Sequence, residues 1–261
     1  MAFITVERIA NLAVVRLARA EARNALTVAM AQELTAALAG VNADDACRVV
    51  VLAGDGATFC AGLDLKAAIA EGPENAPEWM ALQEVFSGLI EQIRKMRQPV
   101  IGAIQGAAVG AGLGIALACD VRIAAPSAQF LVGAVKLGLS AGECGISYHL
   151  PRLIGAGRAF EIMLTGRAVN GEEALAIGLV SHLAEPGSLL DRALEVARTI
   201  AANAPYAVKH TKQVMWTNLD APLQNALELE NHVQVLGLLT QDFAEAARAF
   251  AEKRAPAFTG R

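Results

Sequence analysis

The chain begins with two short β-rich runs. FITVERI and LAVVRL are separated only by Ala10 and Asn11. Two such runs joined by so short a connection predict a β-hairpin. A third run, Arg48 to Gly54, is almost wholly apolar and ends in glycine. It predicts a buried strand of a sheet that is covered on both faces.

Helical spacing of apolar residues appears twice before position 99, once on each side of the third run. Thr27 is an expected N-cap, and Met30, Leu34 and Leu38 share one face of the helix that would follow it. A second amphipathic helix is expected to end near Pro99. Its apolar stripe consists of Phe86, Leu89, Ile90 and Ile93. The polar stretch before it, Ala67 to Pro77, is expected to be an irregular surface loop.

Strand and helix patterns then alternate up to about position 203. PVIGAI, VRIAA and QFLVG indicate further buried strands, which makes residues 1–203 an α/β core. From position 204 to 261 only helical patterns follow, in VKHTKQVMWTNL, PLQNALELENHVQVLGLLT and FAEAARAFAEKR. This second segment is expected to be an all-helical oligomerisation region.

The stretch GAGLGIALACD, Gly110 to Asp120, raises the question of why three glycines precede an apolar run. The run from Pro99 to Cys119 is just long enough for a membrane span, but its proline and glycines break it and no aromatic belt flanks it. The spacing G-x-G-x-G does not match the dinucleotide motif G-x-G-x-x-G. What remains is a helix N-terminus whose free N–H groups face a ligand, or a tight packing turn.

Composition limits the partners of the protein. The chain has 261 residues, a formal net charge of −4 and 54% hydrophobic residues, so we expect no nucleic-acid partner and no membrane partner. Its four cysteines lack the spacing of a zinc site, and no metal is expected. The N-terminus lacks the features of a signal peptide, which favours a cytoplasmic protein.

Six segments, taken in order, resemble the enoyl-CoA hydratase/isomerase (crotonase) superfamily. They are EARNALT, FCAGLDL, PVIGAIQGAAVGAGLGIALACDVRIAA, AQFLVGAVKLGLS, LPRLIGAGRAFEIMLTGR and EALAIGLV. The resemblance implies an α/β fold with a crotonase-like spiral of ββα turns, and a C-terminal all-helical trimerisation region. It also implies homotrimers or hexamers built as dimers of trimers.

The same resemblance implies a coenzyme A thioester as substrate and no permanently bound cofactor. The backbone N–H groups of Leu63 and Ala111 would form an oxyanion hole, which stabilises developing negative charge on the thioester oxygen. The residues expected to line the coenzyme A site are Arg23, Ala25, Ala61, Asp64, Leu65 and Lys66. Asp64 could also face the acyl group, although a role in fixing its own loop is favoured.

The chain departs from the family at both carboxylates that hydratases use for proton transfer. The matching positions hold Gly114 and Ala134, neither of which can move a proton. Glu143, in LSAGECGISYHL, is the nearest remaining acid–base candidate, in a loop where some family branches place a functional carboxylate. Tyr148 and His149 are expected to be packing or surface residues rather than catalytic groups. Glu71, Glu74, Glu78 and Glu84 border the expected acyl end.

Two hypotheses follow. The first is an acyl-CoA enzyme that stabilises a thioester enolate, with isomerase-like or atypical hydratase or hydrolase chemistry, in which Glu143 moves a proton or activates water. The second is a non-catalytic protein that binds coenzyme A thioesters and lacks both usual glutamates. The residues alone leave both open.

Overall fold

The computed structural model describes residues 2–70 and 72–261, and its core is a sheet lying between helical layers. The main sheet has the strand order β1-β2-β3-β4-β6-β9. Strands β1 and β2 form the predicted antiparallel hairpin, and the other neighbours are parallel. A small second sheet has the order β5-β7-β8.

The elements have the following bounds. The strands are β1 (Ile4–Ile9), β2 (Leu12–Leu17), β3 (Val49–Gly54), β4 (Val100–Ile104), β5 (Ala107–Val109), β6 (Val121–Ala124), β7 (Gln129–Leu131), β8 (Ala168–Asn170) and β9 (His182–Leu183). The α-helices are α1 (Val28–Ala43), α2 (Leu65–Ala70), α3 (Ala76–Lys95), α4 (Ala111–Ala118), α5 (Ile146–Ile154), α6 (Ala156–Thr165), α7 (Gly171–Ala176), α8 (Leu189–Ala201), α9 (Pro205–Asn218), α10 (Leu223–Leu238) and α11 (Gln241–Glu252). Two 3₁₀ turns, η1 (Ala20–Ala22) and η2 (Ala134–Leu137), complete the set.

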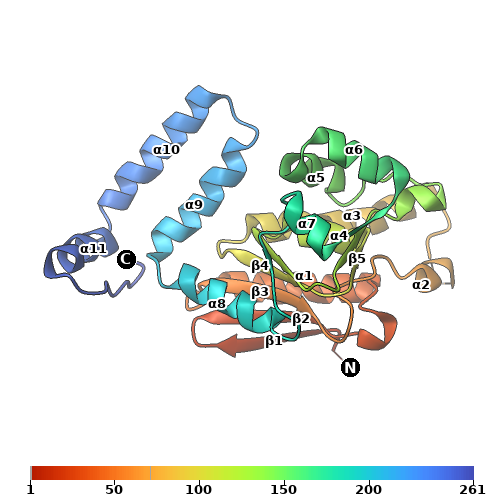
Figure 1. Ribbon diagram of the computed structural model, residues 1–261, viewed down its shortest axis with the longest axis horizontal. Coiled ribbons are helices and arrows are strands. Elements are labelled where there is room, and N and C mark those ends of the chain that lie inside the picture. The colour runs from red at the N-terminus through yellow and green to blue at the C-terminus, as the bar shows by residue number, and fades with distance from the viewer. Residues whose placement is uncertain (1, 71) are drawn as a thin grey trace.

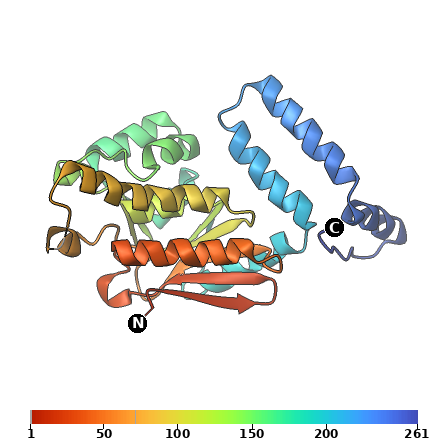
Figure 2. The same cartoon turned by 180° about the vertical axis from the view of Figure 1, so that it is seen from behind.

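Helices cover both faces of the main sheet at its centre, which explains why the central strands β3 and β4 are apolar throughout. Alternate residues of β3 point to opposite faces: Val50 and Leu52 pack with α1 and α3, whereas Val49 and Val51 pack with α8. Figure 2 shows α1 and α3 side by side across one face. The stripe predicted on α3 is fully confirmed, since its four apolar residues are all buried.

The three C-terminal helices extend away from the core, as Figures 1 and 2 show. A buried joint attaches α9 to it. Asp120 accepts hydrogen bonds from Trp216 Nε1 at 2.7 Å and from the Val100 amide at 2.7 Å, and it pairs with Lys212 Nζ at 2.9 Å. Lys212 also donates to two backbone carbonyl groups, so all three of its N–H bonds are used.

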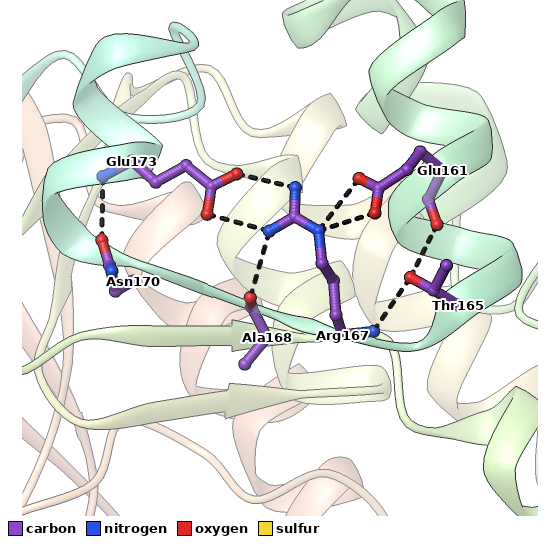
Figure 3. Close-up of polar contacts among 6 residues, drawn as sticks. All are labelled: Glu161, Thr165, Arg167, Ala168, Asn170 and Glu173. Carbon is purple, nitrogen blue, oxygen red and sulfur yellow. Dashed lines mark hydrogen bonds and ion pairs between the residues drawn. The ribbon is translucent and has the colours of Figure 1, made fainter.

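A second polar joint ties α6 to α7. Figure 3 shows the Arg167 guanidinium lying between the carboxylates of Glu161 and Glu173, with hydrogen bonds of 2.7–2.9 Å. Because the fork of arginine matches two carboxylates geometrically, this arrangement fixes the turn through β8.

One expectation about local structure is wrong in part. The stretch from Ala67 to Pro77 is not wholly irregular, because α2 includes residues up to Ala70 and α3 begins at Ala76. Asn75 caps α3 by accepting a hydrogen bond from the Glu78 amide at 3.1 Å. Glu71 lies outside the described residues. None of the helices in the described part of the chain is both long and apolar enough to cross a membrane.

Candidate active site

The glycine-rich segment GAGLG forms the first turn of α4. Gly110 precedes the helix with φ 50° and ψ −119°, a conformation that a residue with a side chain adopts only under strain. Its amide donates to Leu131 O at the end of β7, at 3.1 Å. All eight residues of α4 are buried and none is polar. The N-terminus of this helix is therefore fixed rigidly inside the core.

The second predicted segment, FCAGLDL, lies directly against the start of α4. The Cys60 amide donates a hydrogen bond to Ala107 O, and the Val109 amide donates one to Cys60 O, both at 3.0 Å. Gly62 has φ +83°, and a Cβ atom there would lie 2.6 Å from Val109 O and 3.8 Å from the Ala111 nitrogen. Only glycine lets the Leu63 loop approach α4 this closely.

The structure thus brings Leu63 and Ala111 together, although they are 48 positions apart in the sequence. Within residues 2–70 and 72–261, neither of their backbone N–H groups donates a hydrogen bond. The Ala111 amide is unpaired because it opens a helix. The Leu63 amide is unpaired because its bridge to Leu26 uses the groups on either side, Gly62 O and Asp64 N, at 2.7 and 2.9 Å.

Glu143 lies beside this pair of amides. Its Oε1 would be 3.1 Å from a Cβ atom on Gly110, the residue directly before Ala111. The side chain is half-buried, and burial raises the pKa of the Glu143 carboxyl group. No ion pair with a cation offsets this burial within the described part of the chain. A carboxyl group of this kind can exchange a proton near neutral pH more readily than an exposed glutamate.

The other two glycines of the segment accommodate neighbouring backbone. A Cβ atom on Gly112 would lie 2.5 Å from Cys60 O. One on Gly114 would overlap the carbonyl oxygen of Cys144 and lie 3.3 Å from the Ile90 side chain. The position that the resemblance matches to the first hydratase carboxylate therefore has no room for a side chain in this structure. Ala134, at the second place, is buried at the start of η2.

The residues expected to line the coenzyme A site occupy the two loops next to Leu63. Arg23, Leu65 and Lys66 are exposed, whereas Ala25 and Ala61 are half-buried. Asp64 lines a cavity beside Leu63, but its carboxylate pairs with Arg19 Nη1 at 2.6 Å and accepts the Ala67 amide at 3.1 Å. These contacts lower the pKa of Asp64, the Ala67 amide first and the Arg19 hydrogen bond next.

A mainly apolar cavity of about 550 Å³ adjoins Leu63. Leu26, Leu82 and Val85 contribute to its wall, together with α2. Glu78 also lines it, but its carboxylate bonds Asn75 Nδ2 and the Glu74 amide at the start of α3. Glu84 is exposed. Glu71 cannot be placed, because it lies outside the described residues.

The sequence analysis missed the polar contacts that hold the two loops together. Asn24 is fully buried; its Oδ1 accepts the Arg19 amide at 2.9 Å, and its Nδ2 donates to Thr58 O at 2.7 Å and Asp55 O at 3.0 Å. Periodicity could not reveal these contacts, because Arg19 and Asn24 lie in irregular segments. The only signal was the asparagine in the motif RNALT.

Tyr148 and His149 belong to a separate cluster against α9. The Tyr148 hydroxyl donates to Asp220, and His149 lies edge-on to Trp216, with ring centroids 5.7 Å apart. Burial lowers the pKa of His149 to about 4, so its ring is neutral near pH 7. Neither residue lies at the Leu63–Ala111 pair, in keeping with a packing role.

Comparison with known proteins places these features in a family. The model of the enoyl-CoA hydratase/isomerase family matches residues 7–261. The chain is 42% identical to (E)-benzylidenesuccinyl-CoA hydratase of Thauera aromatica, over 98% of this chain and 99% of that one. It is 34% identical to 1,2-epoxyphenylacetyl-CoA isomerase of Escherichia coli, over 93% of both chains.

The fold agrees with that assignment. The crystal structure of enoyl-CoA hydratase from Bacillus anthracis superposes with a TM-score of 0.95 at 35% identity, covering 99% of this chain and 100% of the other. The chain therefore belongs to the enoyl-CoA hydratase/isomerase family, has the crotonase fold, and is an enzyme of the hydratase/isomerase type. The resemblance noted in the sequence is confirmed.

The unpaired state of Glu143 predicts a pH-dependent change in stability. Since burial raises its pKa in the folded protein, the ionised form is disfavoured there, and the carboxyl group stabilises the fold best when protonated. Glu143→Gln should therefore raise the free energy of unfolding at pH 7–8, on the order of 0.5–1 kcal/mol. The gain should vanish below about pH 4, where glutamate is protonated in both states. Chemical denaturation across pH 3–8 measures it; a variant less stable than the parent at pH 8 would contradict the prediction.

Proposed function

We propose that the enzyme binds an acyl-CoA thioester with its carbonyl oxygen between the Leu63 and Ala111 amides. The observation that carries this proposal is that two unpaired N–H groups lie close together beside a half-buried carboxylate. As the thioester forms an enolate, negative charge develops on that oxygen. Each donor of such a pair contributes about 3–4 kcal/mol to the stability of the transition state in enzymes where it has been removed.

Glu143 is the proposed acid–base group. Its carboxylate takes a proton from the carbon next to the thioester carbonyl, or from the carbon beyond a double bond that is conjugated with that carbonyl. The electron pair moves to the carbonyl oxygen, and the protonated Glu143 returns the proton to a different carbon. One group that removes and returns a proton is sufficient for a double-bond shift, so isomerisation is the reaction that this site supports best.

Hydration or hydrolysis by Glu143 is the second candidate reaction. Its support is that the relative from Thauera aromatica is named a hydratase. In this case Glu143 would take a proton from water instead of carbon. The usual pair of hydratase carboxylates is replaced by Gly114 and Ala134, so such chemistry would be atypical.

The coenzyme A part of the substrate is proposed to lie along the two loops that flank Leu63. Arg23 and Lys66 are exposed cations without an ion-pair partner in the described part of the chain, and they suit the phosphate groups. Ala25, Ala61 and Leu65 would contact the pantetheine, and the 550 Å³ cavity would take the acyl group. The reaction needs no bound cofactor, because proton transfer and charge stabilisation come from the protein itself.

We further propose that residues 204–261 mediate assembly into a homotrimer or a hexamer, and that the core comprises residues 1–203. Exposed apolar side chains on α10 and α11 support this, with Leu239 78% and Phe250 87% exposed. A single chain gains little by leaving them in water. A cytoplasmic location is part of the same proposal.

The acid–base role predicts the activity of Glu143→Gln. Turnover of enoyl-CoA or dienoyl-CoA thioesters should fall about 10²-fold or more, the usual effect of removing a positioned proton-transfer group. Affinity should stay within a few-fold. In the parent, kcat/KM should decline as the pH falls through a pKa above the ordinary glutamate value, because the base must be ionised.

Glu7→Gln, at an exposed position of β1, is the matched control and should retain full activity. If Glu143→Gln turns over as fast as the parent, Glu143 is only a loop residue. If the parent binds the thioesters and converts none of a broad panel, the non-catalytic alternative is favoured. Gly114→Glu is not a simple way to restore a hydratase carboxylate, since its Cβ would overlap Cys144 O.

The oxyanion hole predicts a preference among ligands. Acyl-CoA thioesters should bind more tightly than free coenzyme A, since only the thioester supplies the carbonyl oxygen. Isothermal calorimetry with short-, medium- and long-chain acyl-CoA would measure this difference. Absence of binding throughout the series would refute the assignment of the substrate.

The assembly proposal predicts a molar mass three or six times that of the 27.2 kDa chain. Leu239→Asp and Phe250→Asp should each shift the protein towards smaller species, because a carboxylate buried in an apolar interface is unfavourable. Ile69→Asp, at an exposed position on α2, is the control and should leave the mass unchanged. Light scattering at micromolar concentration measures the molar mass of each protein. A monomeric parent would contradict the proposal.

A further inference from the structure

The loop that carries Leu63 is held by one arginine from outside the site. Arg19 Nη1 lies 2.6 Å from Asp64 Oδ2 and also donates to Ala25 O at 2.9 Å. It therefore connects the segments RNALT and FCAGLDL at a single nitrogen. Both charged side chains are largely buried, with 21% of Arg19 and 13% of Asp64 exposed.

The hydrogen bonds of Asp64 also restrict the backbone of Leu63, the residue before it. Its amide donates to Leu26 O at 2.9 Å, its Oδ1 accepts the Ala67 amide at 3.1 Å, and its carbonyl accepts the Ala68 amide at 2.9 Å. The peptide on one side of Leu63 is thus fixed by Asp64 and that on the other by Gly62. With both flanking peptides fixed, the direction of the Leu63 N–H bond has little freedom left.

We propose that Arg19 and Asp64 form a positioning pair that directs the Leu63 amide towards the thioester oxygen. This inference rests on the proposed oxyanion hole. Neither side chain needs to touch the substrate, because the carboxylate of Asp64 is already occupied by Arg19 and the Ala67 amide. The pair acts on the geometry of one hydrogen-bond donor, and misalignment of such a donor weakens the bond steeply.

The direct alternative is that Asp64 itself exchanges a proton with the acyl group. The contacts oppose it. A carboxylate that accepts a charge-assisted hydrogen bond and a backbone amide is held ionised, and its pKa is lowered. Glu143 lacks such partners and has a raised pKa. Of these two carboxylates, Asp64 therefore suits a structural role in holding the loop, and Glu143 suits proton transfer.

The test compares two ligands that differ by one oxygen atom, butyryl-CoA and the thioether S-butyl-CoA. The parent should favour the thioester. In Arg19→Met and Asp64→Asn the preference should fall about fivefold, the effect of losing one neutral hydrogen bond, while affinity for the thioether stays within about twofold. Arg19→Lys keeps the charge but not the planar guanidinium group. Its preference for the thioester should therefore lie between that of the parent and that of Arg19→Met.

Two further measurements separate positioning from a general loss of structure. With a substrate that the parent converts, kcat should fall about tenfold or more, with a smaller change in KM, since the donor matters most when charge develops. The infrared shift of the bound thioester carbonyl should shrink in the same variants. Arg16→Met is the matched control, because Arg16 lies on β2 of the hairpin and its ion-pair partner is Asp55, at 3.8 Å, rather than Asp64.

The outcomes are distinct. Variants that keep the full preference for butyryl-CoA, or that lose affinity for both ligands equally, would overturn the positioning pair alone. A parent with equal affinity for the two ligands would overturn the oxyanion hole and the pair together. Thermal unfolding of each variant confirms that the proteins compared are folded, and Arg19→Lys keeps the test decisive if Arg19→Met does not fold.

Discussion

The close approach of two loops, one carrying Cys60 and the other carrying Glu143 and Cys144, to the first turn of α4 is the constraint on which the site depends. Gly110, Gly112 and Gly114 each face a different neighbour: the Glu143 carboxylate, the Cys60 carbonyl and the Cys144 carbonyl. A methyl group at any of the three would displace its neighbour or strain the backbone. The loss of backbone entropy at three glycines is offset by a rigid, apolar helix whose first amide, that of Ala111, has no hydrogen-bond partner in the described part of the chain.

This close packing fixes the two amides more rigidly than it fixes Glu143, the group that changes charge in the proposed mechanism. The two amide donors are fixed by the helix, by the Leu26–Leu63 bridge and by the contacts of Asp64. Glu143 instead lies in a turn with no cation beside it, next to Cys144, which has a positive φ of 43°. Functional sites commonly accept unfavourable burial and strained backbone of this kind, because the surrounding structure compensates for them.

The parts of the fold that could be predicted from sequence depend on local patterns. The hairpin at Ala10, the Thr27 cap and the stripe on α3 follow from turn length, capping chemistry and periodicity. The identity of each glycine's neighbour could not be predicted, because Cys60 and Cys144 are distant in sequence and nothing in their own segments indicates the contact. The contacts of Arg19 and Asn24 were missed for the same reason. The helical turn at Leu65–Ala70 was missed because it is too short to show a period.

The absence of a side chain at position 114 has two consequences. A Cβ atom there would overlap the Cys144 carbonyl oxygen and lie 3.3 Å from the Ile90 side chain. The turn that carries Glu143 can therefore lie this close to α4 only because residue 114 is glycine. In the proposed mechanism, the same glycine leaves the position of one hydratase carboxylate empty and lets the turn of Glu143 approach the two amides. One proposed proton-transfer group beside two fixed amides favours moving a proton between two carbons of the same acyl chain over adding water across its double bond.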